Sequence, residues 1–211
     1  LWGLTQECMS RTMFPLANYT KDEIRQMAFD WGYESLSKKP ESYEICFVPD
    51  NDYRGFLKRR VPELEDAVSG GLFVNKDGEI LGKHDGYPFY TVGQRKGLGG
   101  GFKKPMYVTE IRPESNTVVL GEVDELLKNS LVFRGANMQK YEKIPAGREF
   151  VTMVRYNDRG TLSEVEMLGD DRYRVHFKGN VRGVAPGQSA VVYEGEDVLG
   201  GGIIERPQGF N

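Results

Sequence analysis

Residues 172–178 read Arg-Tyr-Arg-Val-His-Phe-Lys, and this alternation decides the fold of the C-terminal part of the chain. Tyr173, Val175 and Phe177 point to one face and the polar residues point to the other, as a half-buried strand requires. Further strands are expected at 131–137, 148–156, 161–168, 188–194 and 197–205. Turn signals such as Ala185-Pro186-Gly187 separate them. About six short strands with regular turns predict a closed antiparallel β-barrel over residues 130–211.

The middle of the chain, residues 67–129, predicts a small and mainly β domain. Asp77-Gly78 supplies a tight turn between two apolar runs and indicates a hairpin. Two more strands are expected at 106–111 and 117–121, joined by a turn-rich connection. A helical turn at 124–128 is expected to lead into the barrel.

Residues 1–66 indicate the end of an α/β domain. Thr20-Lys21-Asp22-Glu23 is a capping box, because the Thr20 hydroxyl and the Glu23 carboxylate can each accept a backbone bond from the other residue. Apolar residues then recur at helical spacing, at Ile24, Met27, Ala28 and Trp31. This pattern predicts a helix over 21–31 with one buried face. A second helix is expected over 53–60, with Phe56 and Leu57 facing inward.

The composition is that of a globular chain. Its 211 residues are 39% apolar and 28% charged, and the net charge is -3 at pH 7. This balance argues against bulk attraction to nucleic acid, so an RNA contact would need a local basic surface. No apolar run approaches the ~20 residues of a membrane span, and the first residues lack the basic region of a signal peptide. We therefore expect a cytoplasmic chain without a membrane segment.

Cysteine and histidine are scarce. Cys8 and Cys46 are the two cysteines, and with His84 and His176 they form no cluster with zinc-ligand spacing. No metal site is expected, and a reducing compartment fits best. His84 is expected to be a turn or surface residue without an acid–base role, and His176 a solvated one. Cys8 is predicted to be structural.

A local basic surface is indicated by residues 86–109, which contain no carboxylate. Arg95, Lys96, Lys103 and Lys104 lie there among five aromatic residues, Tyr87, Phe89, Tyr90, Phe102 and Tyr107. Cations meet phosphates and aromatic rings stack on bases, so this composition suits RNA. The alternative is a β-hairpin with solvated lysines, because surface lysine clusters are common.

Cys46 follows hydroxyls and carboxylates in Glu41-Ser42-Tyr43-Glu44-Ile45-Cys46-Phe47-Val48. A cysteine between two apolar residues is most often a small buried hydrophobe. The functional alternative is a thiol that becomes a thiolate and acts as a nucleophile or sulfur carrier.

Two stretches resemble bacterial tRNA-specific 2-thiouridylases. Residues 39–48 are similar to the second-cysteine motif of that family, with Glu41 where the family usually has Asp. Residues 84–99, His-Asp-Gly-Tyr-Pro-Phe-Tyr-Thr-Val-Gly-Gln-Arg-Lys-Gly-Leu-Gly, resemble a family signature at every defined position. The resemblance covers essentially the whole chain, in order.

The resemblance implies a C-terminal portion of such an enzyme. Residues 1–66 would be the end of a nucleotide-binding α/β domain, 67–129 a central tRNA-binding domain, and 130–211 a six-stranded, elongation-factor-like barrel. The ATP-binding pyrophosphatase loop and a first catalytic cysteine would lie in the preceding region. We find no glycine-rich phosphate loop feeding a helix in this chain, so no cofactor-binding residue is expected here.

The function implied by the resemblance is sulfur transfer to C2 of the wobble uridine in the tRNAs for Lys, Glu and Gln. ATP, with Mg²⁺, would adenylate the uridine. Cys46 would carry a persulfide loaded by a sulfur-relay protein or cysteine desulfurase, and the first cysteine would resolve the intermediate as a disulfide. Arg155, Tyr156 and Gln188 match family positions that contact tRNA, and Arg95 and Lys96 are expected to join them. The chain is expected to be a monomer and to show no turnover alone.

Two other functions are alternatives to sulfur transfer. A non-catalytic RNA-binding or translation-factor-like module would make Cys46 a core residue. An upstream Ser-Gly-Gly-x-Asp-Ser motif would favour the enzyme over that module. Methyltransferase activity is rejected, because the sequence contains no glycine-rich S-adenosylmethionine loop.

Overall fold

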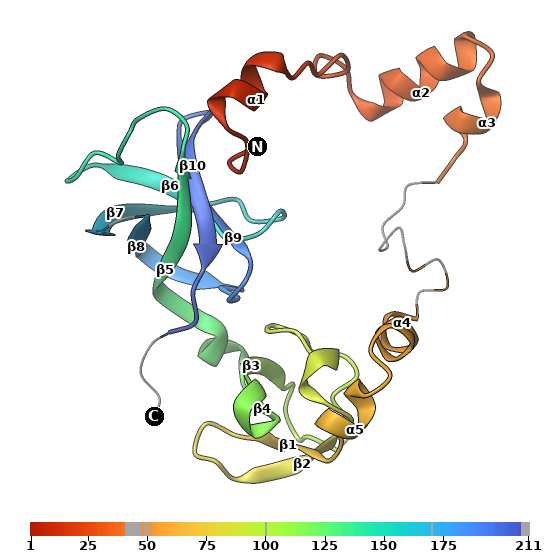
Figure 1. Ribbon diagram of the computed structural model, residues 1–211, viewed down its shortest axis with the longest axis vertical. Helices are drawn as coiled ribbons and strands as arrows, with labels where there is room; N and C mark the ends of the chain where they lie inside the picture. Colours follow the sequence, from red (N-terminus) through yellow and green to blue (C-terminus); the bar gives the residue numbers. More distant parts are fainter. Residues whose placement is uncertain (41–47, 49, 51, 100, 170, 208–211) are drawn as a thin grey trace. The chain divides into compact units, whose positions relative to one another are not determined.

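The computed structural model describes residues 1–40, 48, 50, 52–99, 101–169 and 171–207 (Figure 1). It divides into two compact units. One comprises Glu7–Leu64, and the other comprises Leu1–Gln6 with Glu65–Asn211. Cys46 lies outside the described residues.

Short helices make up the first unit. They are α1 (Gln6–Arg11), α2 (Lys21–Asp30), α3 (Glu34–Ser37) and α4 (Tyr53–Arg60), and α5 (Leu64–Val68) follows them. The two predicted helices are confirmed as α2 and α4. Both capping-box bonds at the start of α2 are present, and the Thr20 N–H donates to Glu23 Oε2 at 2.6 Å.

The predicted buried face of α2 is wrong for the part of the chain that the structure describes. No residue of α2 is buried, and Trp31 is 69% exposed. Capping and helical spacing are local properties, whereas burial needs a partner surface, so the helix forms without the predicted burial. Phe56 and Leu57 on α4 are half-buried.

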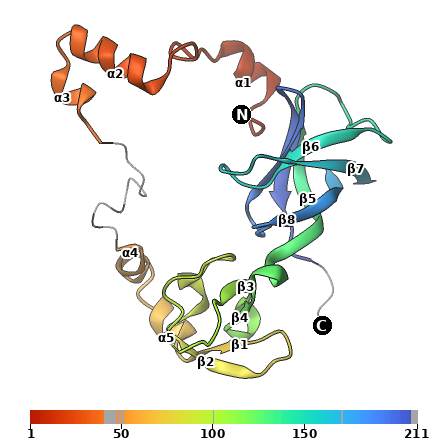
Figure 2. The same ribbon diagram turned by 180° about the vertical axis from the view of Figure 1, so that it is seen from behind.

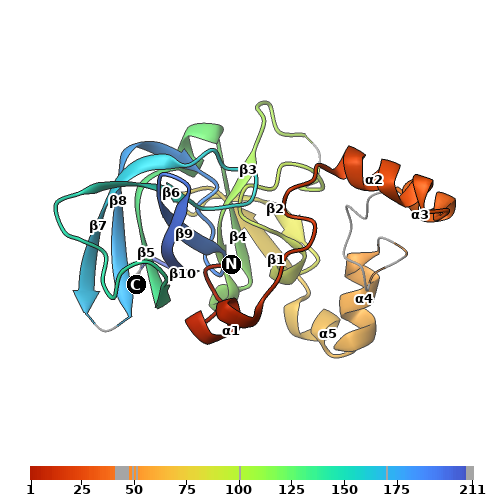
Figure 3. The same ribbon diagram turned by 90° about the horizontal axis from the view of Figure 1, so that it is seen from above.

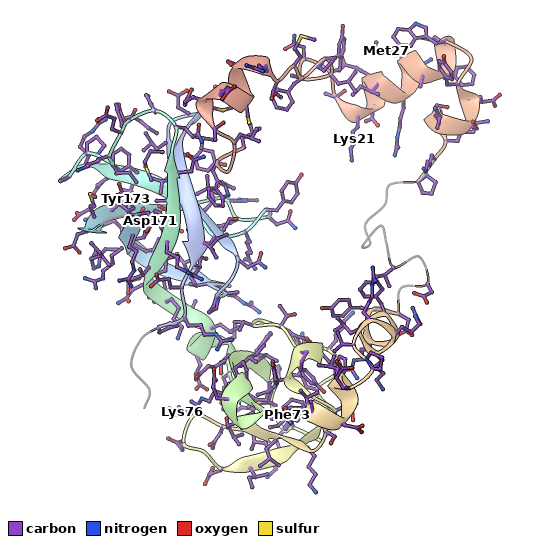
Figure 4. The ribbon with its side chains drawn as sticks, viewed as in Figure 1. Lys21, Met27, Phe73, Lys76, Asp171 and Tyr173 are labelled. Carbon is purple, nitrogen blue, oxygen red and sulfur yellow. The ribbon has the colours of Figure 1, made fainter. Side chains whose placement is uncertain are left out.

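A four-stranded mixed sheet forms the middle of the chain. Its strands are β1 (Gly71–Val74), β2 (Ile80–His84), β3 (Tyr107–Arg112) and β4 (Thr117–Gly121), in the order β2-β1-β4-β3. The predicted hairpin is confirmed, and Gly78 takes a φ of +86° in its turn. The β1–β4 pair is parallel. Figure 4 shows Phe73 among the side chains packed around this sheet and Lys76 at the hairpin end.

Three 3₁₀ turns connect the strands. They are η1 (Tyr87–Phe89), η2 (Pro113–Ser115) and η3 (Val123–Leu126). The helical turn expected at 124–128 corresponds to η3, but its last two residues already belong to the first barrel strand.

The predicted six-stranded barrel is confirmed. Its strands are β5 (Leu127–Met138), β6 (Glu149–Met153), β7 (Thr161–Gly169), β8 (Arg172–Arg182), β9 (Ser189–Glu194) and β10 (Asp197–Ile204). They close in the order β10-β5-β8-β7-β6-β9, with every pair antiparallel (Figure 3). Tyr173, Val175 and Phe177 are buried in its core as the alternation predicts, and His176 is exposed.

The N-terminal residues are tied to this barrel although they are far from it in sequence (Figure 2). The side-chain amides of Asn137 and Gln139 donate to the backbone oxygens of Trp2 and Leu4 at 2.7 to 2.9 Å. In the described part of the chain no helix combines the length and apolar character needed to cross a membrane. The same residues contain no metal-binding cluster of His, Cys, Asp or Glu.

Candidate nucleic-acid interface

The basic loop, which we define as residues 90–106, is docked on the edge of the mixed sheet. It follows η1 and precedes β3, one of the two edge strands of that sheet. The Gly93 N–H donates to the Val108 oxygen at 2.7 Å, and the Val108 N–H donates to the Gln94 oxygen at 2.9 Å. Leu98, only 3% exposed, anchors the loop on the other side of Arg95 and Lys96. The described residues of the loop contain no strand, so they do not form the β-hairpin of the alternative.

The Gln94 side chain closes the turn that carries the two cations. Its Oε1 accepts from the Thr91 N–H at 3.0 Å, and its Nε2 donates to the Lys96 oxygen at 2.8 Å. The Gln94 N–H also donates to the Thr91 oxygen at 2.9 Å. One side chain thus satisfies backbone groups on both sides of Arg95.

The loop cations differ in their pairing. Arg95, Lys96 and Lys103 are exposed, and none forms an ion pair with the residues that the structure describes. Lys104 Nζ lies 2.7 Å from Glu122 Oε1, and this hydrogen bond raises the pKa of Lys104. Arg95 and Lys96 therefore keep their charge available for a phosphate, whereas that of Lys104 is already matched.

Two of the five aromatic residues in the window whose composition suits RNA are core residues. Phe89 and Tyr90 are each 7% exposed. The Tyr90 ring lies edge-on to Phe73, with 5.2 Å between ring centroids. The turn at η1 directs these rings into the sheet's core, where they bury more apolar area than a surface position allows.

His84 is also a core residue, contrary to the prediction of a turn or surface position. It is 5% exposed, and its ring lies 5.0 Å from Phe73 and 5.2 Å from Tyr90. The Gly86 N–H donates to Nδ1 at 3.0 Å, which places the ring proton on Nε2. That nitrogen finds no hydrogen-bond partner among the described residues. Burial lowers the pKa of His84, with the Asp85 charge opposing, so the ring is held neutral.

Asn116 was missed by sequence reasoning. Its side chain joins the end of α5 to the start of η1, next to the basic loop. Its side chain donates to the Val68 oxygen at 2.6 Å and accepts from the Tyr87 N–H at 3.3 Å. Its φ of 46° makes it the one non-glycine residue with a positive φ in the described part. Asparagine tolerates this conformation better than most residues, and its place in the turn after η2 was the available signal.

On the barrel, Arg155 and Tyr156 lie in the loop between β6 and β7. Both are exposed, and Tyr156 is 96% exposed. The Asp158 carboxylate fixes this loop by accepting from the N–H groups of Val154 and Gly160, at 3.0 and 3.1 Å. An unburied aromatic ring on a fixed turn is available for stacking on a base.

Gln188 is exposed in the loop between β8 and β9. Gly183 in the same loop lies against the Arg155 side chain, since a Cβ added there would be 3.1 Å from Arg155 Nη1. The structure therefore brings Arg155 to the loop that carries Gln188, although the two residues are distant in sequence.

Three domain models match the chain in succession. The tRNA methyl transferase HUP domain matches residues 1–50, and the tRNA methyl transferase PRC-barrel domain matches residues 54–122. The aminomethyltransferase beta-barrel domain matches residues 131–204, which contain nearly all of the barrel.

Curated proteins similar to this chain share one name, tRNA-specific 2-thiouridylase MnmA. The tRNA-specific 2-thiouridylase MnmA of Cytophaga hutchinsonii is 55% identical over 97% of this chain and 56% of the relative. That of Amoebophilus asiaticus is 54% identical over 97% of this chain and 54% of the relative. That of Salinibacter ruber is 48% identical over 99% of this chain and 55% of the relative.

The chain belongs to the tRNA-specific 2-thiouridylase family. It spans about half the length of these relatives. Within the chain, the signature of residues 84–99 divides into two structural groups. His84 and Leu98 are buried and Gln94 bonds the loop to itself, whereas Arg95 and Lys96 face solvent.

The structure describes one of the two cysteines of the chain. Cys8 is exposed on α1, so the structure gives its thiol no place in a core. Cys46, predicted to carry the sulfur, lies outside the described residues, and its role stays a prediction.

Proposed function

We propose that the full-length protein is an ATP-dependent sulfurtransferase that thiolates C2 of the wobble uridine in the tRNAs for Lys, Glu and Gln. Membership of the thiouridylase family supports sulfur transfer to tRNA. The observation that carries the proposal for this chain is the exposed Arg95–Lys96 pair on a docked loop, without carboxylate partners among the described residues.

In this proposal the chain holds the RNA through two surfaces. Arg95 and Lys96 contact backbone phosphates, which fixes the position of the RNA without reading its sequence. Arg155, Tyr156 and Gln188 form a second contact on the barrel, where the Tyr156 ring stacks on an unpaired base. Together these contacts hold the anticodon arm while the uridine leaves its stack.

Cys46 carries the sulfur as a persulfide, loaded by a sulfur-relay protein or cysteine desulfurase. The terminal sulfur attacks C2 of the activated uridine, and the C2 oxygen leaves with its activating group. A second thiol then attacks Cys46 Sγ, which releases the thiolated base and leaves a disulfide. A thiolate-like sulfur is required, because the neutral form is a poor nucleophile.

ATP does not fit the residues of this chain. The sequence has no glycine-rich loop leading into a helix that could hold phosphates. Activation of the uridine, with ATP and Mg²⁺, is therefore assigned to another part of the protein. We expect the chain alone, a cytoplasmic monomer in this proposal, to show no ATP-dependent thiolation of tRNA.

Persulfide loading tests the role of Cys46. The chain is incubated with glutathione persulfide, and its peptides are analysed by mass spectrometry before and after reduction. We expect the Cys46 peptide to gain one sulfur atom that dithiothreitol removes, and the Cys46→Ser variant to gain none there. Cys8 is the matched control, because its thiol is exposed in the same chain.

The outcomes separate the two function classes. Equal loading of Cys8 and Cys46, or loading of Cys8 alone, would contradict the carrier role. Binding of tRNA without any loading of Cys46 would favour a non-catalytic RNA-binding module. Methyl transfer, named in two of the domain-model descriptions, is not proposed, because the sequence lacks a glycine-rich S-adenosylmethionine loop.

A further inference from the structure

Gln94 uses both ends of its side-chain amide inside the basic loop. The oxygen accepts from the Thr91 N–H, and the nitrogen donates to the Lys96 oxygen. These bonds, at 3.0 and 2.8 Å, lie in the normal range for strong hydrogen bonds. Gln94 is half-buried, with both amide ends engaged within the loop.

The bonded backbone groups bracket the two exposed cations. Thr91 lies before Arg95, and the Lys96 oxygen lies directly after it. The Val108 pairing fixes the main chain of Gly93 and Gln94 on the sheet, and Leu98 fixes the far side. Among the described residues, the Gln94 amide supplies a hydrogen bond to the stretch between these two fixed ends, at the Lys96 oxygen.

A fixed loop matters because ordering a flexible one costs free energy on binding. Each backbone residue fixed on binding loses conformational entropy, and each immobilised long side chain adds to that cost. A loop ordered in the free protein avoids the backbone part of this cost. Its cations then meet phosphates at a spacing set before the RNA arrives.

We propose that Gln94 is a positioning residue for RNA binding: its amide holds the backbone turn that presents Arg95 and Lys96 to RNA backbone phosphates. The inference rests on the proposed function, because the loop must be an RNA surface. Gln94 itself makes no contact with the RNA and acts only through the two cations. A glutamine is required, since glutamate has no donor for the Lys96 oxygen and methionine has neither group.

The test is a double-mutant cycle on the 211-residue chain. Gln94→Met removes both bonds without changing the charge, and Arg95→Ala/Lys96→Ala removes the cations. The dissociation constant for an unmodified tRNA transcript is measured from ~0.05 to ~0.2 M salt, where phosphate contacts dominate affinity. In the parent, Gln94→Met should weaken tRNA binding about tenfold and make the slope of log affinity against log salt concentration smaller by about one. In the chain that lacks both cations, Gln94→Met should change neither the affinity nor this slope.

Asn75→Leu is the matched control. Asn75 is another half-buried amide that bridges a turn of the same sheet, accepting from Asp77 and Glu79 N–H and donating to the Glu79 carboxylate. Its turn carries two carboxylates and Lys76, so it offers no uncompensated cations. Asn75→Leu should destabilise its turn and leave the tRNA affinity within about twofold of the parent.

The inference and the proposed function fail in different ways. If Gln94→Met weakens binding equally with and without the cations, or has no effect while removal of the cations does, the positioning role is overturned alone. If removal of Arg95 and Lys96 leaves tRNA affinity unchanged, the loop is not an RNA surface. If the parent binds no tRNA at ~0.05 M salt, the RNA-holding part of the proposed function is overturned.

Discussion

The barrel and the basic loop both expose cations, but they pair them differently. On the barrel, Arg174 and Lys178 of β8 face Glu166 and Glu164 of β7, and Arg172 forms two bonds to Glu205 at 2.9 and 2.7 Å. On the loop, Arg95 and Lys96 have no such partner among the described residues. On the proposed RNA surface, Arg95 and Lys96 are thus unmatched by carboxylates among the described residues, whereas these barrel cations are neutralised by neighbours.

The two regions are also held together differently. The barrel is closed by six strand pairs around a hydrophobic core, so its order comes from burial. The basic loop and the segments next to it depend on three single side chains that bond to backbone groups. These side chains are His84, Gln94 and Asn116. Core substitutions should therefore have the largest effects, and substitutions on the binding surface should leave stability almost unchanged.

The largest effect is expected for Phe133→Ala in the barrel. Phe133 is fully buried, and its ring stacks on Tyr173 with 5.5 Å between centroids. Loss of its contacts and the cavity left behind should lower the free energy of unfolding by about 3–5 kcal/mol. Urea unfolding followed by circular dichroism measures this change. A loss below about 1 kcal/mol would show that burial does not dominate the barrel.

Asn116→Ala should have the next largest effect. It leaves the Val68 oxygen and the Tyr87 N–H without their partner and places alanine at a positive φ. The expected loss is about 2–3 kcal/mol in the free energy that protects the mixed sheet. Amide hydrogen exchange of β1 and β4 reports it. Asn116→Gly removes the backbone strain of a positive φ but does not restore the two hydrogen bonds. A glycine variant as stable as the parent would therefore contradict the bonding role.

A smaller effect is expected from pH at His84. Because burial lowers the pKa of His84, the unfolded chain binds the proton more readily than the folded chain does. The stabilisation is full above about pH 6.5 and is lost as the pH falls toward the lowered pKa of the folded state. Protonation of Nδ1 also removes the acceptor of the Gly86 N–H.

Hydrogen exchange of the mixed sheet between about pH 5 and 7.5 measures this dependence. His84→Asn keeps an acceptor near Nδ1 but does not titrate, so its profile should be flatter than that of the parent. His176 is exposed and present in both chains, which makes it the internal control. Identical profiles for the two chains would disprove a buried neutral His84.

The smallest effect on stability is expected for Tyr156→Ala. At 96% exposure the ring contributes little packing, so the free energy of unfolding should change by less than about 0.5 kcal/mol. Binding of tRNA should weaken by about 1–3 kcal/mol, the value of one stacked base. Tyr156→Phe keeps the ring and should bind like the parent. Equal losses for alanine and phenylalanine would assign the contact to the hydroxyl instead.

The sequence predicted what depends on local pattern. Alternation at Tyr173, Val175 and Phe177 placed β8 and its inward face, and Asp77-Gly78 placed the β1–β2 turn. Burial and pairing over long distance were not predictable in this way. Three features depend on residues that are far apart in sequence. They are the parallel β1–β4 pair, the burial of His84 and the bond from Asn116 to the Val68 oxygen.

The candidate site was predicted in its residue types but not in its organisation. Arg95 and Lys96 could be chosen because their window has no carboxylate, and the structure places both in solvent. Phe89 and Tyr90, two aromatic residues of the same window, are buried, because composition does not show which way a ring points. The contact of Arg155 with the Gly183 backbone depends on barrel closure, which no local motif encodes.

The pairing of the basic loop with Val108 has a consequence for solubility. An open strand edge is a template for pairing with another chain, and β3 is one of the two edge strands of its sheet. The Gly93 and Gln94 main chain occupies both hydrogen-bonding groups of Val108. A deletion of this segment would therefore uncover a self-association site, and a loop-shortened chain should aggregate for reasons unrelated to nucleic acid.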